Sequence, residues 1–171
     1  VPVVAVAIAI GVLPLCRVKG PHVSPVNGGV PLENGALTRR VAGSIAIGYN
    51  KDSCDLKLSQ QQLSEVLLGT ISNWKTLGCQ EGPIKVSTRS DRSGTTLALT
   101  KSLSDWSPEF RQTVGTGMRV NFPVGSTAGG NEGVRRFIET TPGSIGYVNV
   151  PSIKGKVQAA ALQNREGNYI C

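Results

Sequence analysis

Aromatic, charged and metal-binding residues are all scarce in this chain of 171 residues. Aromatic side chains make up 5% of it and charged side chains 17%, below the ~25% charged of an average globular domain. The low charge excludes a disordered polyelectrolyte. Nucleic-acid binding is not expected, because it needs basic clusters and stacking aromatics, whereas Lys and Arg are scattered here. A single histidine, His22, and the lack of a C-x-x-C pair argue against zinc, and no metal or cofactor is predicted.

Two features of the composition are informative. Hydrophobic residues make up 39%, which is enough for one domain with a core, although the longest apolar run, residues 3–15, is too short to span a bilayer. The net charge is +7, from 18 Lys and Arg against 11 Asp and Glu. A field of this sign attracts anions.

Residues 1–40 form an uncertain N-terminal segment. The apolar stretch at 3–13 resembles the hydrophobic part of a secretory signal but lacks an initiator Met and a positive leading region. We favour the alternative, a buried β segment rich in Val and Ile. Residues 17–40 are rich in Gly, Pro, Asn and Ser and are expected to form a loop with His22 at its surface.

Strand and helix patterns alternate from residue 41 onward. Strands are predicted at 41–49, 83–88 and 144–150, with a weaker one at 154–162 and a short extended piece (MRVNF) in a Gly-rich segment. A helix begins at Ser59 with a capping box to Gln62 and ends at Gly69. A second helix is opened by Ser93 and Gly94 and broken before Pro108, and Asn131 is predicted to cap a third. This alternation predicts an α/β fold.

The segment 89–96 (RSDRSGTT) combines several features of an anion site. It follows a predicted strand and opens a predicted helix, where free backbone N–H groups and the positive end of the helix dipole lie. Gly94 permits close approach to the backbone, Ser93 and Thr95 add hydroxyl groups, and Arg89 can bind an oxyanion with two parallel hydrogen bonds. Asp91 could pair with Arg89 and hold its guanidinium in place. The plainer alternative is an ordinary helix cap beside a surface arginine, and the spacing alone does not decide between the two.

The cysteines also leave two readings open. Cys54 and Cys79 lie in turn-like polar surroundings on either side of one predicted helix. They could form a disulfide, which would place the chain in an oxidising compartment, or remain free thiols. Neither a G-x-S-x-G elbow nor a Walker loop is present, so the sequence supplies no enzyme motif of those classes.

Taken in order, several motifs resemble those of periplasmic phosphate-binding proteins, the solute receptors of phosphate-specific ABC importers. They are VAGSIAIGYN with CDLKLS, LLGTISNW, RSDRSGTT, VGTG through FPVG, GGNEGV and PGSIGYV, and they cover about residues 41–170. The YNK-x-x-C and LGC motifs are similar to those of cyanobacterial members, which favours a disulfide between Cys54 and Cys79.

This resemblance implies one lobe, residues 41–171, of a two-lobed periplasmic-binding-protein fold, with a mixed sheet flanked by helices. It implies a periplasmic, non-enzymatic receptor that binds inorganic phosphate and delivers it to an ABC permease. The phosphate ligands would be Arg89, Ser93, Gly94 and Thr95, with Asp91 supporting Arg89. A second lobe or subunit would complete the site.

The sequence departs from the family pattern in two ways that bear on binding. Arg92 stands where the family has a glycine, which costs energy if the position needs a positive φ but adds a cation near the anion. The lobe that carries a further donor set and an aspartate is not recognisable in this sequence. Two rival functions therefore remain: a truncated, non-binding lobe that acts as an interaction module, and a phosphate-ester hydrolase that uses the same anion cradle.

Overall fold

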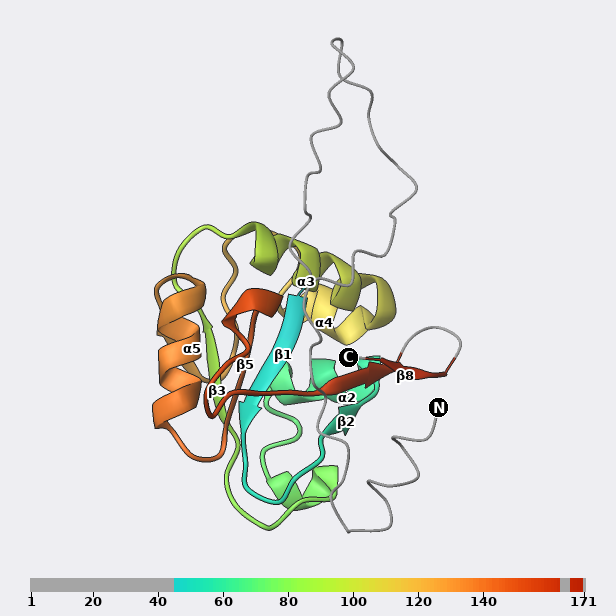
Figure 1. Ribbon diagram of the computed structural model, residues 1–171. Coiled ribbons are helices and arrows are strands. Elements are labelled where there is room, and N and C mark those ends of the chain that lie inside the picture. The colour runs from blue at the N-terminus through green and yellow to red at the C-terminus, as the bar shows by residue number, and fades with distance from the viewer. Residues whose placement is uncertain (1–44, 164–166, 171) are drawn as a thin grey trace, which may run out of the picture.

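The computed structural model describes residues 45–163 and 167–170 (Figure 1). The predictions for residues 1–40, including the 3–13 segment and His22, lie outside the described residues, as do Cys16 and Cys171. Within those two described ranges, no helix is long and apolar enough to cross a membrane.

Short strands and helices alternate along the described chain. The strands are β1 Ile45–Asn50, β2 Lys57–Leu58, β3 Lys85–Arg89, β4 Ser126–Ala128, β5 Ser144–Asn149, β6 Gln158–Ala159, β7 Ala161–Gln163 and β8 Tyr169–Ile170. The helices are α2 Gln60–Leu68, α3 Gly94–Trp106, α4 Pro108–Thr113 and α5 Gly130–Thr140, with 3₁₀ turns η1 Trp74–Leu77 and η2 Val150–Ser152.

The main sheet is mixed, with strand order β4-β3-β5-β1-β6. β3 runs parallel to β4 and β5, whereas β1 runs antiparallel to both β5 and β6. A smaller sheet, β2-β7-β8, lies beside it. The predicted architecture, a mixed sheet flanked by helices, is confirmed.

The two faces of the sheet are covered by different helices because side chains of a strand alternate between its faces. Ile47 and Tyr147 point into the larger core, where α2, α3 and α4 pack. Val148 points to the other face and packs with Val134 and Ile138 of α5. In Figure 1, α5 stands on one side of β3, β5 and β1. The sheet is therefore the middle of three layers.

α5 lies close to the sheet because two glycines face it. Gly48 of β1 and Gly146 of β5 are register partners. A Cβ at Gly48 would come within 2.9 Å of a Val157 methyl carbon, and one at Gly146 would come within 2.7 Å of the Ser87 carbonyl oxygen. Both also approach the Ile138 side chain of α5, at 3.4 and 3.2 Å. A Cβ at Gly146 would also come within 3.0 Å of a Val134 methyl carbon, so glycine at this position allows α5 to lie close to the sheet.

The capping predicted for α2 is present. The Ser59 hydroxyl accepts a hydrogen bond from the backbone N–H of Gln62 at 3.1 Å, and the Gln62 side chain accepts one from the Ser59 N–H at 3.0 Å. Gly69 ends the helix with φ at +82°. This element could be predicted because all of its signals lie within eleven residues of one another.

Three elements differ from the sequence predictions. α4 was not predicted, although Pro108 at its first position and Ser107 as its cap are typical of a helix start. The extended piece predicted at MRVNF forms no strand, and the strand of that region is β4, a few residues later. The predicted strand at 154–162 is instead two short strands, β6 and β7, that belong to different sheets.

Cys54 and Cys79 form a disulfide that links the segment after β1 to the end of η1. The two cysteines are 25 residues apart, with Cα atoms at 5.4 Å. The buried Tyr49 hydroxyl donates to the Cys54 carbonyl at 2.6 Å and accepts from the Leu56 N–H at 3.2 Å. The Cys54 end of the disulfide is therefore hydrogen-bonded to a side chain of the core.

Candidate functional site

The predicted anion site lies where β3 ends and α3 begins. Ser93 is the N-cap of α3, and its hydroxyl oxygen accepts hydrogen bonds from the N–H groups of Thr95 at 3.1 Å and Thr96 at 3.2 Å. A Cβ placed on Gly94 would meet no atom within 4 Å. The amino end of this 13-residue helix is therefore open above Gly94, and its dipole favours negative charge there.

Arg89, the last residue of β3, lies four residues before the N-cap Ser93 and has a buried side chain. Its side chain is only 8% exposed. The guanidinium donates from Nε to one Asp91 carboxylate oxygen at 2.7 Å and from Nη2 to the other at 2.6 Å. This bidentate pair fixes one edge of the guanidinium plane. The pairing proposed for Asp91 from the sequence is present in the structure.

The ion pair shifts the titration of both partners. The hydrogen bonds from Arg89 are the main reason that the pKa of Asp91 falls well below its usual range, and the Gly130 N–H lowers it further. The same bond raises the pKa of Arg89. Asp91 is 43% exposed, so it is kept ionised by its partners rather than by its place in the core.

The start of α5 also reaches Arg89 and its partner Asp91. Asn131, in the first turn of α5, accepts at its side-chain oxygen from Arg89 Nη1 at 3.2 Å and from the backbone N–H of Asn149 at 3.1 Å. The Gly130 N–H at the start of α5 donates to Asp91 at 3.1 Å. Because β3, β4 and β5 are parallel, their carboxyl ends lie at one edge of the sheet, and Arg89 lies at this edge.

Tyr147 connects the backbone of Arg89 to the first turn of α3. Its fully buried hydroxyl accepts from the Arg89 N–H at 3.1 Å and lies 2.9 Å from the Thr96 hydroxyl. Burial is the main reason that the pKa of Tyr147 is raised. The hydroxyl thus remains protonated and joins the two elements that form the site.

The structure therefore brings all five sequence-predicted site residues to one place and adds two. Arg89, Asp91, Ser93, Gly94 and Thr95 lie within one strand-to-helix connection. Sequence reasoning missed Tyr147 altogether and assigned Asn131 the wrong role. Asn131 does not cap α5: the cap is Gly129, and the Asn131 side chain bonds Arg89 and Asn149 instead. The sequence pattern held no signal for these two contacts, because they depend on the parallel pairing of β3 with β4 and β5.

Arg92, at the position where the resemblance to phosphate-binding proteins implies a glycine, shows no backbone strain. Among the described residues, only Ser53 has a positive φ without being glycine. Arg92 is exposed, and its Nη2 lies 3.7 Å from the Met118 sulfur. Arg92 therefore places a cation next to Ser93 in a backbone conformation that does not require glycine.

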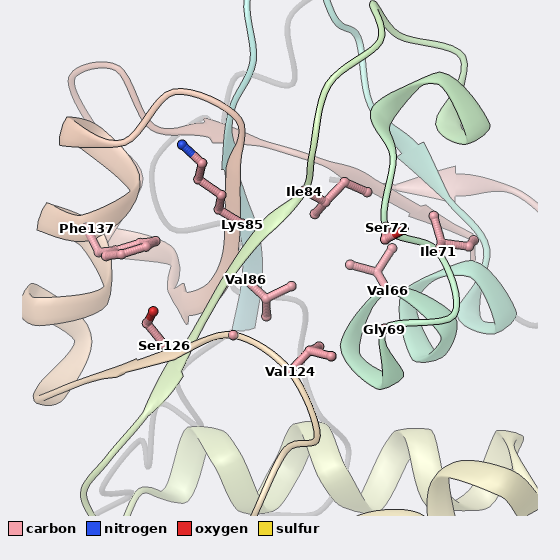
Figure 2. A pocket seen from close by; sticks show the side chains of 11 residues that line it. Val66, Gly69, Ile71, Ser72, Ile84, Lys85, Val86, Val124, Ser126 and Phe137 are labelled. Atoms are coloured by element: carbon pink, nitrogen blue, oxygen red, sulfur yellow. The ribbon is translucent and has the colours of Figure 1, made fainter.

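A separate pocket of about 310 Å³ lies at the opposite end of β3 (Figure 2). Figure 2 shows Phe137 of α5, Val86 of β3 and Val124 lining it. It includes Lys85, the first residue of β3, which is about 13 Å along the strand from Arg89. The pocket is mainly apolar and does not belong to the anion site. In the part of the chain that the structure describes, no group of His, Cys, Asp and Glu could hold a metal ion.

Comparison with known proteins gives both a family and a set of relatives. The model of a PBP superfamily domain matches residues 26–169. The chain is 34% identical over 160 residues to the phosphate-binding protein PstS of Xylella fastidiosa, covering 82% of this chain and 44% of that protein. It is 30% identical over 123 residues to alkaline phosphatase L of Pseudomonas aeruginosa, covering 66% and 33%.

A solved structure shows the same fold. The phosphate-binding protein from Stenotrophomonas maltophilia superposes with a TM-score of 0.57 at 26% identity, over 71% of this chain and 39% of that one. The chain thus spans less than half the length of these relatives.

Proposed function

Since the chain belongs to the PBP superfamily, we propose that it forms one lobe of a phosphate-binding protein of an ABC importer and holds inorganic phosphate between Arg89 and the amino end of α3. The observation that carries the proposal is the buried guanidinium of Arg89, held bidentately by Asp91 beside an open helix N-terminus. An arginine with a purely structural role does not need an uncovered helix N-terminus beside it. An anion-binding arginine needs a guanidinium held in a fixed orientation, with N–H groups left to donate to the ligand.

The donors at this site suit a tetrahedral oxyanion. Among the described residues, three of the five guanidinium N–H groups of Arg89 have partners. The remaining two, one on each terminal nitrogen, are available to the anion. The Ser93 hydroxyl accepts two N–H groups and keeps its own proton to donate, and the Gly94 N–H opens the helix. Thr95 would add its hydroxyl.

This set supplies donors but no carboxylate that is free of an ion pair. Both Asp91 oxygens accept from Arg89, and one of them also accepts from the Gly130 N–H. Phosphate near neutral pH still carries a proton that seeks an acceptor, whereas sulfate does not. The proposed lobe therefore binds phosphate and sulfate with similar affinity, and a second lobe would supply the acceptor that separates them. Capture in the periplasm and delivery to a permease are functions of the complete receptor.

The decisive experiment is a titration of the chain with phosphate and with sulfate, followed by calorimetry or by amide NMR shifts. We expect saturable binding of both anions that Arg89→Ala abolishes. Arg111→Ala is the matched control, because Arg111 is an arginine of α4 that donates to the Ser104 carbonyl at 2.9 Å. No binding at millimolar phosphate by a folded chain would favour the non-binding interaction module.

The relative named as a phosphatase makes a hydrolysis assay part of the same test. The chain is incubated with a generic phosphomonoester, alongside Arg89→Ala. We expect no turnover, because Asp91, the carboxylate of this site, is paired with Arg89 and its lowered pKa makes it a poor base for activating water. Turnover that is lost in Arg89→Ala would contradict the receptor proposal and favour a hydrolase that uses the same anion site.

A further inference from the structure

We propose that Asn131 is a positioning residue that fixes the Arg89 guanidinium in its anion-binding orientation. This inference rests on the proposed function of the same site. Asn131 belongs to α5, and its sequence position predicted only a helix cap. Its side-chain oxygen instead accepts from Arg89 Nη1 at 3.2 Å and from the Asn149 N–H at 3.1 Å.

The amide orientation of Asn131 follows from these partners. Arg89 Nη1 and the Asn149 backbone nitrogen are both donors, so the oxygen and not the NH₂ group must face them. The bond to Asn149 fixes that oxygen against the end of β5. Asn131 thus presents an immobile acceptor to Arg89.

Asp91 alone would not fix the guanidinium. Both of its bonds are made to one edge of the group, Nε and Nη2, and Asp91 lies 43% exposed in the connection between β3 and α3. The Gly130 N–H holds Asp91 itself, but the Nη1 end of the guanidinium has no restraint from Asp91. Asn131 holds this other terminal nitrogen from the first turn of α5.

The helix that carries Asn131 is a rigid base. Val134 and Ile138 of α5 are fully buried, and the glycine pair at 48 and 146 lets the helix lie directly on the sheet. The Gly130 N–H is bonded to Asp91. Arg89 is thus held from both sides by groups whose own positions are set by β5 and α5.

The test is the NMR behaviour of the Arg89 side chain in the intact chain and in Asn131→Ala. With Asn131 present, we expect restricted rotation at Nη1, seen as separate, slowly exchanging Nη1 proton signals. In Asn131→Ala these signals merge, and phosphate binding weakens about tenfold, as for loss of a hydrogen bond to a charged group. In Asn131→Asp, which keeps the acceptor oxygen, the separate signals return.

Asn73→Ala is the matched control. The Asn73 side-chain oxygen also accepts two backbone N–H groups, from Lys75 at 2.9 Å and Gly82 at 3.3 Å, far from the site. This variant should lower stability yet leave the Arg89 signals and phosphate affinity unchanged, so a general loss of stability cannot imitate the expected result.

The possible outcomes separate the two proposals. Unchanged Arg89 signals in Asn131→Ala, or merged signals with unchanged affinity, overturn the positioning role. If the intact chain binds no phosphate, the proposed function fails. The Arg89 signals then decide alone: merging supports Asn131 as the group that restrains Arg89, and no change overturns it.

Discussion

The carboxylate of Asp91 accepts a hydrogen bond from the backbone N–H of Gly130, 39 residues further along the chain, at 3.1 Å. The same oxygen accepts from Nε of Arg89 at 2.7 Å. One side chain therefore orients the arginine and occupies the start of α5, whose own cap, Gly129, makes no side-chain bond. The Asp91 carboxylate thus connects the end of β3 to the start of α5.

Because Asp91 makes these hydrogen bonds as a carboxylate, the free energy of unfolding should depend on pH. The pKa of Asp91 is lower in the folded chain than its usual ~3.9 in the unfolded chain. The stabilisation is therefore fully present above about pH 5 and is lost as the pH falls from about 4 through the lowered pKa. We expect Asp91→Asn to lower the free energy of unfolding at pH 6, with the difference from wild type shrinking below pH 4, in urea titrations at each pH.

Asp105→Asn is the control for this series. Asp105 is an exposed carboxylate of α3 that makes no ion pair among the described residues. Its substitution should change the free energy of unfolding by no more than about 0.5 kcal/mol at pH 6. A constant gap between wild type and Asp91→Asn across the whole acid range would contradict the prediction.

Tyr147→Phe should affect both stability and binding. The change leaves the Arg89 N–H and the Thr96 hydroxyl buried without their common partner, a loss of about 1–3 kcal/mol in the free energy of unfolding. Phosphate affinity should fall as well, because the hydroxyl sets the distance between Arg89 and α3. Urea unfolding and a phosphate titration measure the two effects. Tyr169→Phe, at an exposed tyrosine, should change neither.

Arg92→Gly tests the departure from the family pattern. The free energy of unfolding should not rise, because the Arg92 backbone does not occupy the left-handed region that favours glycine. Phosphate binding should weaken by about twofold and become less sensitive to salt, because one exposed cation is removed beside the site. Arg92→Lys, which keeps the charge, should retain the salt dependence. The measurement is a phosphate titration of the wild type, Arg92→Gly and Arg92→Lys at two ionic strengths. An equal salt dependence in all three proteins would refute the contribution of the Arg92 charge.

Removal of the disulfide should separate stability from binding. Replacing both Cys54 and Cys79 by Ser opens a 25-residue loop and should lower the free energy of unfolding by about 3 kcal/mol. Phosphate affinity of the folded chain should stay the same, because Cys54 follows the end of β1 opposite to the anion site. A denaturant titration of the double variant measures the free energy of unfolding, and a phosphate titration measures the affinity. A binding defect in fully folded protein would show that the two ends of the sheet are coupled.

The local parts of this structure could be predicted from the sequence, and the reason is chain distance. The capping box of α2 and the Arg89–Asp91 pair each involve residues two or three positions apart. Such pairs meet whenever the local element forms. The Ser93 cap of α3 belongs to the same class.

The partners of Arg89 outside its own segment could not be predicted in this way. Tyr147 is 58 residues away and Asn131 is 42 residues away, and both meet Arg89 only because β5 pairs with β3 and α5 packs beside them. Asn131 looked like a cap because Asn is favoured there. The helix instead starts at Gly130, which leaves the asparagine side chain free for a tertiary contact. Only the strand order, which the sequence pattern does not contain, determines these contacts.

The close approach of α5 to Gly48 and Gly146 also determines where this protein can evolve. A side chain at Gly146 would clash with the Ser87 carbonyl and crowd the helix that carries Asn131, and one at Gly48 would clash with Val157. A laboratory selection for tighter binding should therefore yield no replacements at either position. Arg136, on the exposed face of the same helix, is free to vary, whereas Glu132 forms an ion pair with Arg135. Variation in a library of functional variants should therefore appear as a stripe along the outer side of α5, above a sheet surface that stays invariant.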